Sequence, residues 1–80
     1  MNKNKNVNHD ILAGQWKQAR GQVRQNWGML TDDDLDRIGG RFEEIVGLVQ
    51  ERYGYAREKA EQEVTQFIDR YNMKETHGVR

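Results

Sequence analysis

The 80-residue chain contains no cysteine and no proline, and only 9% of its residues are aromatic. The lack of cysteine excludes disulfides, thiolate nucleophiles and cysteine-based metal sites, and it fits a reducing compartment. The lack of proline means that no residue forces a kink in a helix. No stretch approaches the roughly 18 apolar residues of a membrane span, and no apolar run follows the first lysines as in a secretory signal. We expect a cytoplasmic protein without integral membrane association.

Apolar residues are also scarce. Hydrophobic residues make up 35% of the chain and charged residues 32%, against about 45–50% and 25% in an average globular protein. Eighty residues form one domain, and a domain of this size buries only about 60% of its potential surface. We expect a thin core, a broad solvated surface and no deep pocket, and therefore neither a small-molecule substrate nor enzymatic activity.

The most informative feature that is present is an internal repeat with a period of 26 residues. Seven positions of the first copy, Gly14, Trp16, Ala19, Gly21, Val23, Trp27 and Gly28, correspond to Gly40, Phe42, Ile45, Gly47, Val49, Tyr53 and Gly54. Such a repeat marks duplicated supersecondary structure. It predicts two amphipathic helices of one design that bury each other's apolar stripes.

Apolar spacing and capping residues predict four helices. The first spans residues 10–27, a short second follows Thr31, the third spans 41–53 and the fourth spans 55–71. Thr31 is a good N-cap, and Asp34 at the third helical position imitates a capping box. The predicted fold class is all-α: a small four-helix bundle built from two tandem helix-turn-helix units. Its domain covers residues 10–72, between flexible tails at 1–9 and 73–80.

Glycine and aromatic residues refine this prediction. Gly28 and Gly54 are expected to end the helices before them, in the left-handed conformation that glycine tolerates. Gly21 and Gly47 lie inside helices, where each costs about 1 kcal/mol relative to alanine, so they favour a close helix crossing over mere tolerance. The repeat places four aromatic residues in the core: Trp16, Trp27, Phe42 and Tyr53. Tyr55 and Tyr71 are assigned either to the rim of the core or to a contact surface.

The sequence contains no recognisable catalytic or metal-binding pattern. His9 and His77 fall in the predicted tails, which do not hold a catalytic partner at hydrogen-bond distance. The aspartates of residues 32–36 lack the alternation, the central glycine and the final glutamate of an EF-hand loop, so helix capping is the favoured interpretation. The glycines do not form a phosphate-binding loop. We expect no metal and no cofactor.

Formal net charge is zero but unevenly distributed: residues 1–30 carry +4 and residues 31–80 carry −4. This layout could steer an anion such as nucleic acid to Lys17, Arg20 and Arg24, which lie off the apolar stripe of the first helix. It could also be self-complementary, within one monomer or between two. Ordinary solvated faces are the favoured interpretation, because the calculated pI of about 6.7 is well below the value above 9 of a basic DNA-binding domain.

Residues 14–23, 27–35, 47–55 and 60–64 together resemble the CsbD-like family of small bacterial proteins. The resemblance covers roughly residues 10–70 without gaps, whereas the two ends do not match. It implies a small, soluble, all-helical protein that is made in quantity during general stress. It brings no catalytic or ligand-binding residues.

Three functions follow in order of preference. The first is a small soluble stress-associated protein that acts by abundance or by contact with an unknown protein partner or with itself. The alternative is a nucleic-acid-binding module that uses the basic face of the first helix. The third is a membrane-surface protein that uses the tryptophan-bearing first helix, which requires the bundle to open.

Overall fold

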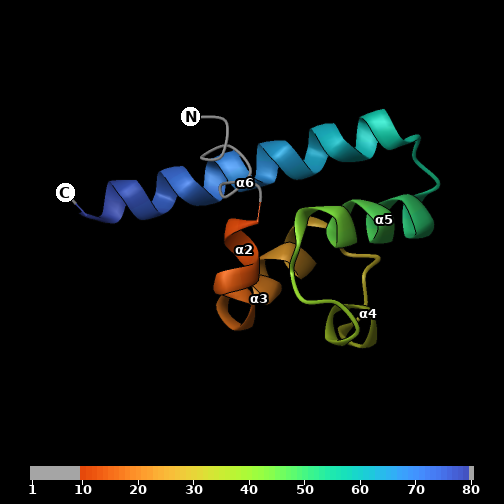
Figure 1. The fold of residues 1–80 in the computed structure, drawn as a ribbon, viewed down its shortest axis with the longest axis horizontal. Helices are drawn as coiled ribbons and strands as arrows, with labels where there is room; N and C mark the ends of the chain where they lie inside the picture. Colours follow the sequence, from red (N-terminus) through yellow and green to blue (C-terminus); the bar gives the residue numbers. More distant parts are fainter. Residues whose placement is uncertain (1–9, 80) are drawn as a thin grey trace.

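The computed structural model describes residues 10–79, with side chains described for residues 10–71, and all regular elements in this part are helices. In chain order they are α2 (Ile11–Gly14), α3 (Trp16–Asn26), α4 (Asp32–Asp36), α5 (Phe42–Tyr53) and α6 (Arg57–Val79). The predicted all-α class is confirmed. Helices α5 and α6 run antiparallel as a hairpin, and α2, α3 and α4 lie along one side of it (Figure 1).

The described chain has five helices instead of four because the predicted first helix is broken at Gln15, whose φ of −128° and ψ of 31° are not helical. The break lets Trp16 leave the line of α2. Its indole Nε1–H donates a hydrogen bond to the carbonyl oxygen of Leu35 at 3.2 Å, and its ring lies beside Gly40. Tertiary contacts of one side chain therefore override the helical propensity of a continuous segment.

The hydrophobic core draws on every described helix. One cluster unites the buried side chains of Leu12, Ala19, Val23, Trp27, Leu30, Leu35, Ile45, Val46, Leu48, Val49, Ala60, Val64, Phe67, Ile68 and Tyr71. Helix α5 contributes four of them, spaced so that one stripe faces the body. No buried side-chain nitrogen or oxygen among the described residues lacks a hydrogen-bond partner.

Helix α6 crosses the amino-terminal helices through aromatic contacts. The ring of Phe67 lies 5.2 Å from that of Trp27 and 6.2 Å from that of Tyr71, measured between centroids. Hydrogen bonds fix the crossing, because the indole of Trp27 donates to Glu63 at 3.0 Å and the hydroxyl of Tyr71 donates to Gln15 at 2.9 Å. The long helix therefore joins the two halves of the sequence repeat.

The predicted core aromatics divide into two groups. Trp27 is buried, whereas Trp16, Phe42 and Tyr53 are partly buried and pack against the edge of the core. Of the two tyrosines left open by the sequence, Tyr71 is a core residue. The other, Tyr55, is half-buried and stacks on Tyr53 with ring centroids 5.2 Å apart.

Three glycines differ from the predictions made for them. Gly54 ends α5 with φ of 72°, as predicted, but Gly28 does not adopt positive φ, and the second left-handed glycine among the described residues is Gly40 with φ of 89°. Helix α3 ends at Asn26 because Trp27 leaves helical geometry to enter the core. Gly21 and Gly47 are exposed, and a Cβ at either would meet no atom within 4 Å. The predicted close helix crossing at these two glycines is therefore wrong.

Helix α6 begins at Arg57, two residues later than predicted, and its backbone continues past the predicted end at Tyr71 to Val79. No proline interrupts this segment, and its first glycine is Gly78, so nothing local stops the helix earlier. Residues 1–9 and 80, and the side chains of 72–79, lie outside the described residues. The predicted flexibility of the two tails falls on them and stays a prediction.

Candidate functional site

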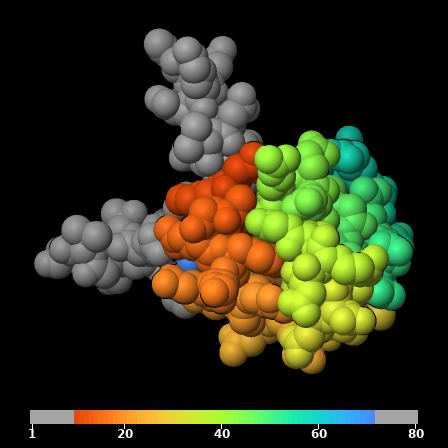
Figure 2. All heavy atoms as spheres, turned by 60° about the horizontal axis from the view of Figure 1, so that its bottom comes forward, coloured from red at the N-terminus to blue at the C-terminus, as the bar shows by residue number. Residues whose placement is uncertain are grey.

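The candidate site is the face shared by α3 and α4, because the sequence-predicted basic residues lie there. Figure 2 shows the orange residues of α3 and the yellow residues that follow them side by side on one face of the molecule. Helix α4 is the acidic element of this face, with aspartates at four of its five positions. Its attachment to the body determines what the basic side chains of α3 contact.

A capping box begins α4, as the sequence predicts. The backbone N–H of Asp34 donates to Oγ1 of Thr31 at 3.1 Å, and the backbone N–H of Thr31 donates to Oδ2 of Asp34 at 3.1 Å. These two bonds satisfy backbone donors at the start of the helix that have no partner within it. A five-residue helix is too short to be stable alone, so this cap and the tertiary contacts of α4 hold it in place.

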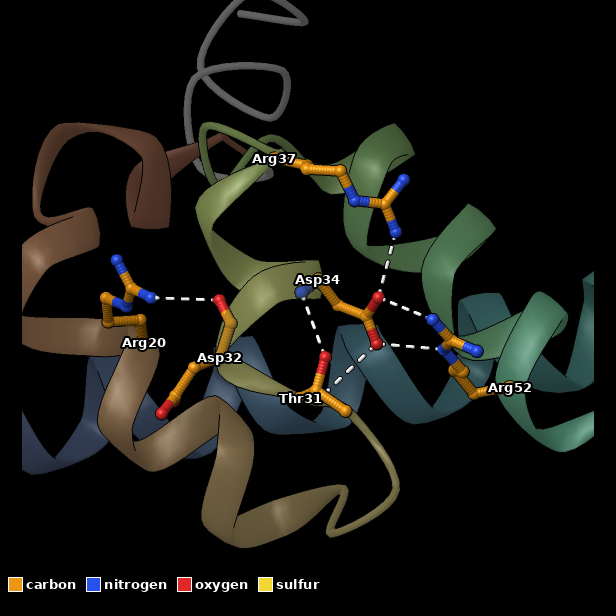
Figure 3. A network of polar contacts seen from close by, with 6 residues as sticks. All are labelled: Arg20, Thr31, Asp32, Asp34, Arg37 and Arg52. Atoms are coloured by element: carbon orange, nitrogen blue, oxygen red, sulfur yellow. Dashed lines mark hydrogen bonds and ion pairs between the residues drawn. The ribbon is translucent and has the colours of Figure 1, made fainter.

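Asp34 anchors α4 to α5 through a buried carboxylate (Figure 3). The guanidinium of Arg52 donates from Nε to Oδ2 at 2.8 Å and from Nη2 to Oδ1 at 2.6 Å, while Arg37 donates to Oδ1 at 2.8 Å. The side chain of Asp34 is only 1% exposed. The hydrogen bonds from Arg52, followed by the backbone bond from Thr31, hold the pKa of Asp34 well below its ordinary value of 3.8.

The sequence assigned Asp34 only a capping role and did not predict its contact with Arg52. Eighteen residues separate the two, and no periodic pattern relates them. Asp34 and the next residue, Leu35, are both buried. Their burial results from packing against distant segments, which the local sequence does not show. In turn, the hydrogen bond to Asp34 raises the pKa of Arg52, which keeps this pair charged across the usual pH range.

Two of the three predicted basic residues contact α4 directly. Arg20 places Nη2 2.6 Å from Oδ1 of Asp36, and the same nitrogen donates to the backbone carbonyl of Asp32 at 3.3 Å. Arg24 places Nη1 2.8 Å from Oδ1 of Asp32. Lys17 is exposed on α3 and makes none of these contacts. The structure thus brings Arg20 and Arg24 together on one acidic helix, whereas Lys17 takes no part in these contacts.

These contacts pair the two oppositely charged halves of the chain at this face. The basic first half of the chain pairs with the acidic second half inside one molecule, which is one of the alternatives left open by the sequence. The pairs are exposed: the side chain of Arg20 is 29% accessible and that of Arg24 is 50% accessible. Solvent screens such pairs, so each contributes little net stability, but together they neutralise the local charge.

A shallow hollow of about 440 Å³ lies between the two helices. Its wall contains Arg20, Gly21 and Arg24 from α3 and Asp32 and Leu35 from α4. Since Gly21 has no side chain, the α3 backbone is open to the solvent here. The hollow offers guanidinium donors beside carboxylate acceptors, which suits polar recognition of a charged partner.

Within the residues that the structure describes, no three His, Cys, Asp or Glu side chains gather as a metal site needs. His9 and the side chain of His77 lie outside them. Over the described helices, none combines the length and apolar character needed to cross a membrane.

The chain is thus a small all-helical protein whose short acidic helix is anchored by a buried aspartate and paired with a basic helix. The CsbD-like family profile matches residues 10–62, and the chain belongs to this family. A UPF0337 protein of Pseudomonas aeruginosa is 52% identical over 64 residues, covering 80% of this chain and 98% of the relative. A UPF0337 protein of Bordetella pertussis is also 52% identical over 64 residues, with 80% and 97% covered. The UPF0337 protein YjbJ of Escherichia coli O6:H1 is 44% identical over 68 residues, covering 85% and 99%.

Proposed function

We propose that this CsbD-like chain is a small stress-associated bacterial protein that acts through contact with other proteins and not through catalysis. The association with stress comes from the family. The observation that carries the contact mechanism is the pairing of Arg20 with Asp36 and of Arg24 with Asp32. This pairing removes the concentrated positive charge that nucleic-acid binding requires.

The charge of the folded body supports the same conclusion. Residues 10–71 carry nine basic and twelve acidic side chains, a net formal charge of −3. A body of that sign repels phosphate backbones over the range of the Debye length, about 10 Å at moderate salt. Charged and polar faces with both signs interspersed instead provide orientation and specificity in contacts between proteins.

The test is photocrosslinking in cells under heat, salt and starvation stress in turn. A photoreactive residue replaces Lys17 on α3, Asp33 on α4 or Asp69 on α6, all of which are exposed. We expect the protein to accumulate under at least one stress and to give discrete protein adducts from one of these faces and not from the others. Unchanged abundance under every stress, or adducts to nucleic acid alone, would contradict the proposal.

A second candidate function is a nucleic-acid-binding module, favoured by the donors that the two arginines retain. The contacts with α4 described above use Nη2 of Arg20 and Nη1 of Arg24, so each guanidinium has further N–H groups that these contacts do not use. A double substitution, R20Q/R24Q, tests this candidate in duplex-DNA binding at low salt. Loss of binding supports it, and unchanged binding contradicts it.

A further inference from the structure

We infer that α4 is an internal competitor for polyanions at the arginine pair of α3, Arg20 and Arg24. Asp32 and Asp36 hold, inside the molecule, the contacts that phosphate oxygens of a nucleic acid would make with these two side chains. The inference rests on the second candidate function and adds to it a partner chemistry and a control on binding. The short acidic helix keeps the affinity of the basic face low.

The geometry of the contacts is that of an anion site already filled. The carboxylate of Asp36 lies 2.6 Å from Arg20, and that of Asp32 lies 2.8 Å from Arg24. Arg20 also donates to the backbone carbonyl of Asp32 at 3.3 Å. Charge-assisted contacts of this length are the ones that guanidinium groups make with carboxylates and phosphates alike, so the two kinds of oxyanion compete for the same donors.

Helix α4 is attached to the body of the protein through residues other than Asp32 and Asp36. Its inner side carries Leu35, which is 1% exposed, and Asp34, which is held by Arg52 through two hydrogen bonds (Figure 3). The anchoring carboxylate of Asp34 and the buried side chain of Leu35 are not the groups that pair with Arg20 and Arg24. Replacing Asp32 and Asp36 by asparagine therefore removes their charge without removing the attachment of α4.

The competition is reversible because the two ion pairs, Arg20–Asp36 and Arg24–Asp32, are accessible to solvent. The side chain of Asp32 is 74% exposed and that of Asp36 is 61% exposed. Exposed pairs are screened and weak compared with buried ones. A polyanion that releases counterions on binding can displace them, whereas the buried pair between Asp34 and Arg52 stays intact.

The test compares two double variants of equal charge. D32N/D36N removes the internal competitor, while D33N/D69N makes the same change of +2 at two exposed aspartates on α4 and α6 that make none of these contacts. Binding of a fluorescent 20-base-pair duplex is measured by anisotropy from about 20 to about 200 mM salt. Circular dichroism and amide NMR verify that α4 remains folded in both.

We expect D32N/D36N to bind the duplex about tenfold tighter than D33N/D69N at about 50 mM salt. The slope of log affinity against log salt should be steeper by about two in D32N/D36N than in D33N/D69N, because the two freed arginines each add a phosphate contact worth about 0.9 of slope. Adding R20Q/R24Q to D32N/D36N should abolish both effects.

Equal gains in the two double variants would overturn the inference, because net charge alone would then explain the affinity. Binding by the wild type that R20Q/R24Q weakens, without any gain in D32N/D36N, would overturn the competition and leave the second candidate function standing. Absence of binding in every variant would overturn both.

Discussion

Replacing Gly40 by alanine is the sharpest test of the packing described above. Gly40 has φ of 89°, and a Cβ built on its backbone would lie 2.6 Å from Cε3 and 2.8 Å from Cδ2 of the Trp16 ring. Both atoms belong to a rigid indole whose Nε1–H donates a hydrogen bond to the carbonyl oxygen of Leu35. The ring therefore cannot yield without breaking that bond or shifting the α3 backbone.

The expected magnitude has two parts. An alanine in the left-handed region costs roughly 1–2 kcal/mol, and forcing extra volume against a packed side chain typically costs about 1–3 kcal/mol. Together they give a loss of about 2–5 kcal/mol in the free energy of unfolding. Because a chain of this length has a total stability of about 4–12 kcal/mol, Gly40→Ala should leave the protein close to its unfolding threshold.

Three other glycines provide matched controls. Gly54 shares the positive φ, at 72°, but a Cβ there meets no atom within 4 Å, so Gly54→Ala should lose only the conformational part, about 1–2 kcal/mol. Gly21 and Gly47 are helical, open and of negative φ. Alanine at either should stabilise the protein by about 0.5–1 kcal/mol.

Urea unfolding, followed by circular dichroism and by tryptophan fluorescence, gives the free energy of unfolding of each of the four alanine variants relative to the wild type. The fluorescence of the folded state should change in Gly40→Ala and not in the controls, because only that variant displaces an indole. A loss below about 0.5 kcal/mol in Gly40→Ala, or equal losses at Gly40 and Gly54, would refute the reasoning.

Three further predictions concern polar contacts. Asp34→Asn should lower stability much more than Asp33→Asn in urea unfolding, because only Asp34 is buried against arginines; equal losses would contradict this. Because the pKa of Asp34 is lowered from 3.8, the stabilisation that its carboxylate contributes is complete above pH 3.8 and is lost as pH falls below that value. The acid-induced fall in the free energy of unfolding should therefore be smaller in Asp34→Asn than in the wild type. An equal fall in the two proteins would count against the buried pair. Tyr71→Phe should lose about 0.5–1.5 kcal/mol through its bond to Gln15, measured by thermal unfolding, whereas no loss would show that water replaces this bond.

Local patterns predicted the elements that local forces determine. The apolar stripe of α5, its end at Gly54 and the capping box of Thr31 and Asp34 involve residues three to seven positions apart. Hydrogen bonds and side-chain contacts at such spacing are visible in the sequence. They fix where these helices begin and end.

The features that sequence reasoning missed all depend on contacts between distant segments. The break at Gln15 and the special role of Gly40 both follow from the position of the Trp16 indole, which lies across from residues 35 and 40. The repeat obscured this role, because it treats Trp16 and Phe42 as equivalent. Only the first of them donates a side-chain hydrogen bond.

The candidate site was predicted in part for the same reason. Arg20 and Arg24 were identified by their place off the apolar stripe, and the uneven charge of the two halves indicated a possible pairing. The particular partners Asp32 and Asp36 depend on how the turn after Trp27 places α4 against α3. That turn uses no left-handed glycine and leaves no local signature in the sequence.

Asp32 and Asp36 neutralise the arginine pair of α3 inside the molecule. The most direct measurement is an amide NMR titration of the wild-type protein with short duplex and single-stranded DNA, at low salt and then at physiological salt. We expect no saturable shifts at Lys17, Arg20 and Arg24 at physiological salt. Saturable shifts centred on these three residues that persist at physiological salt would contradict this expectation and establish α3 as a nucleic-acid interface.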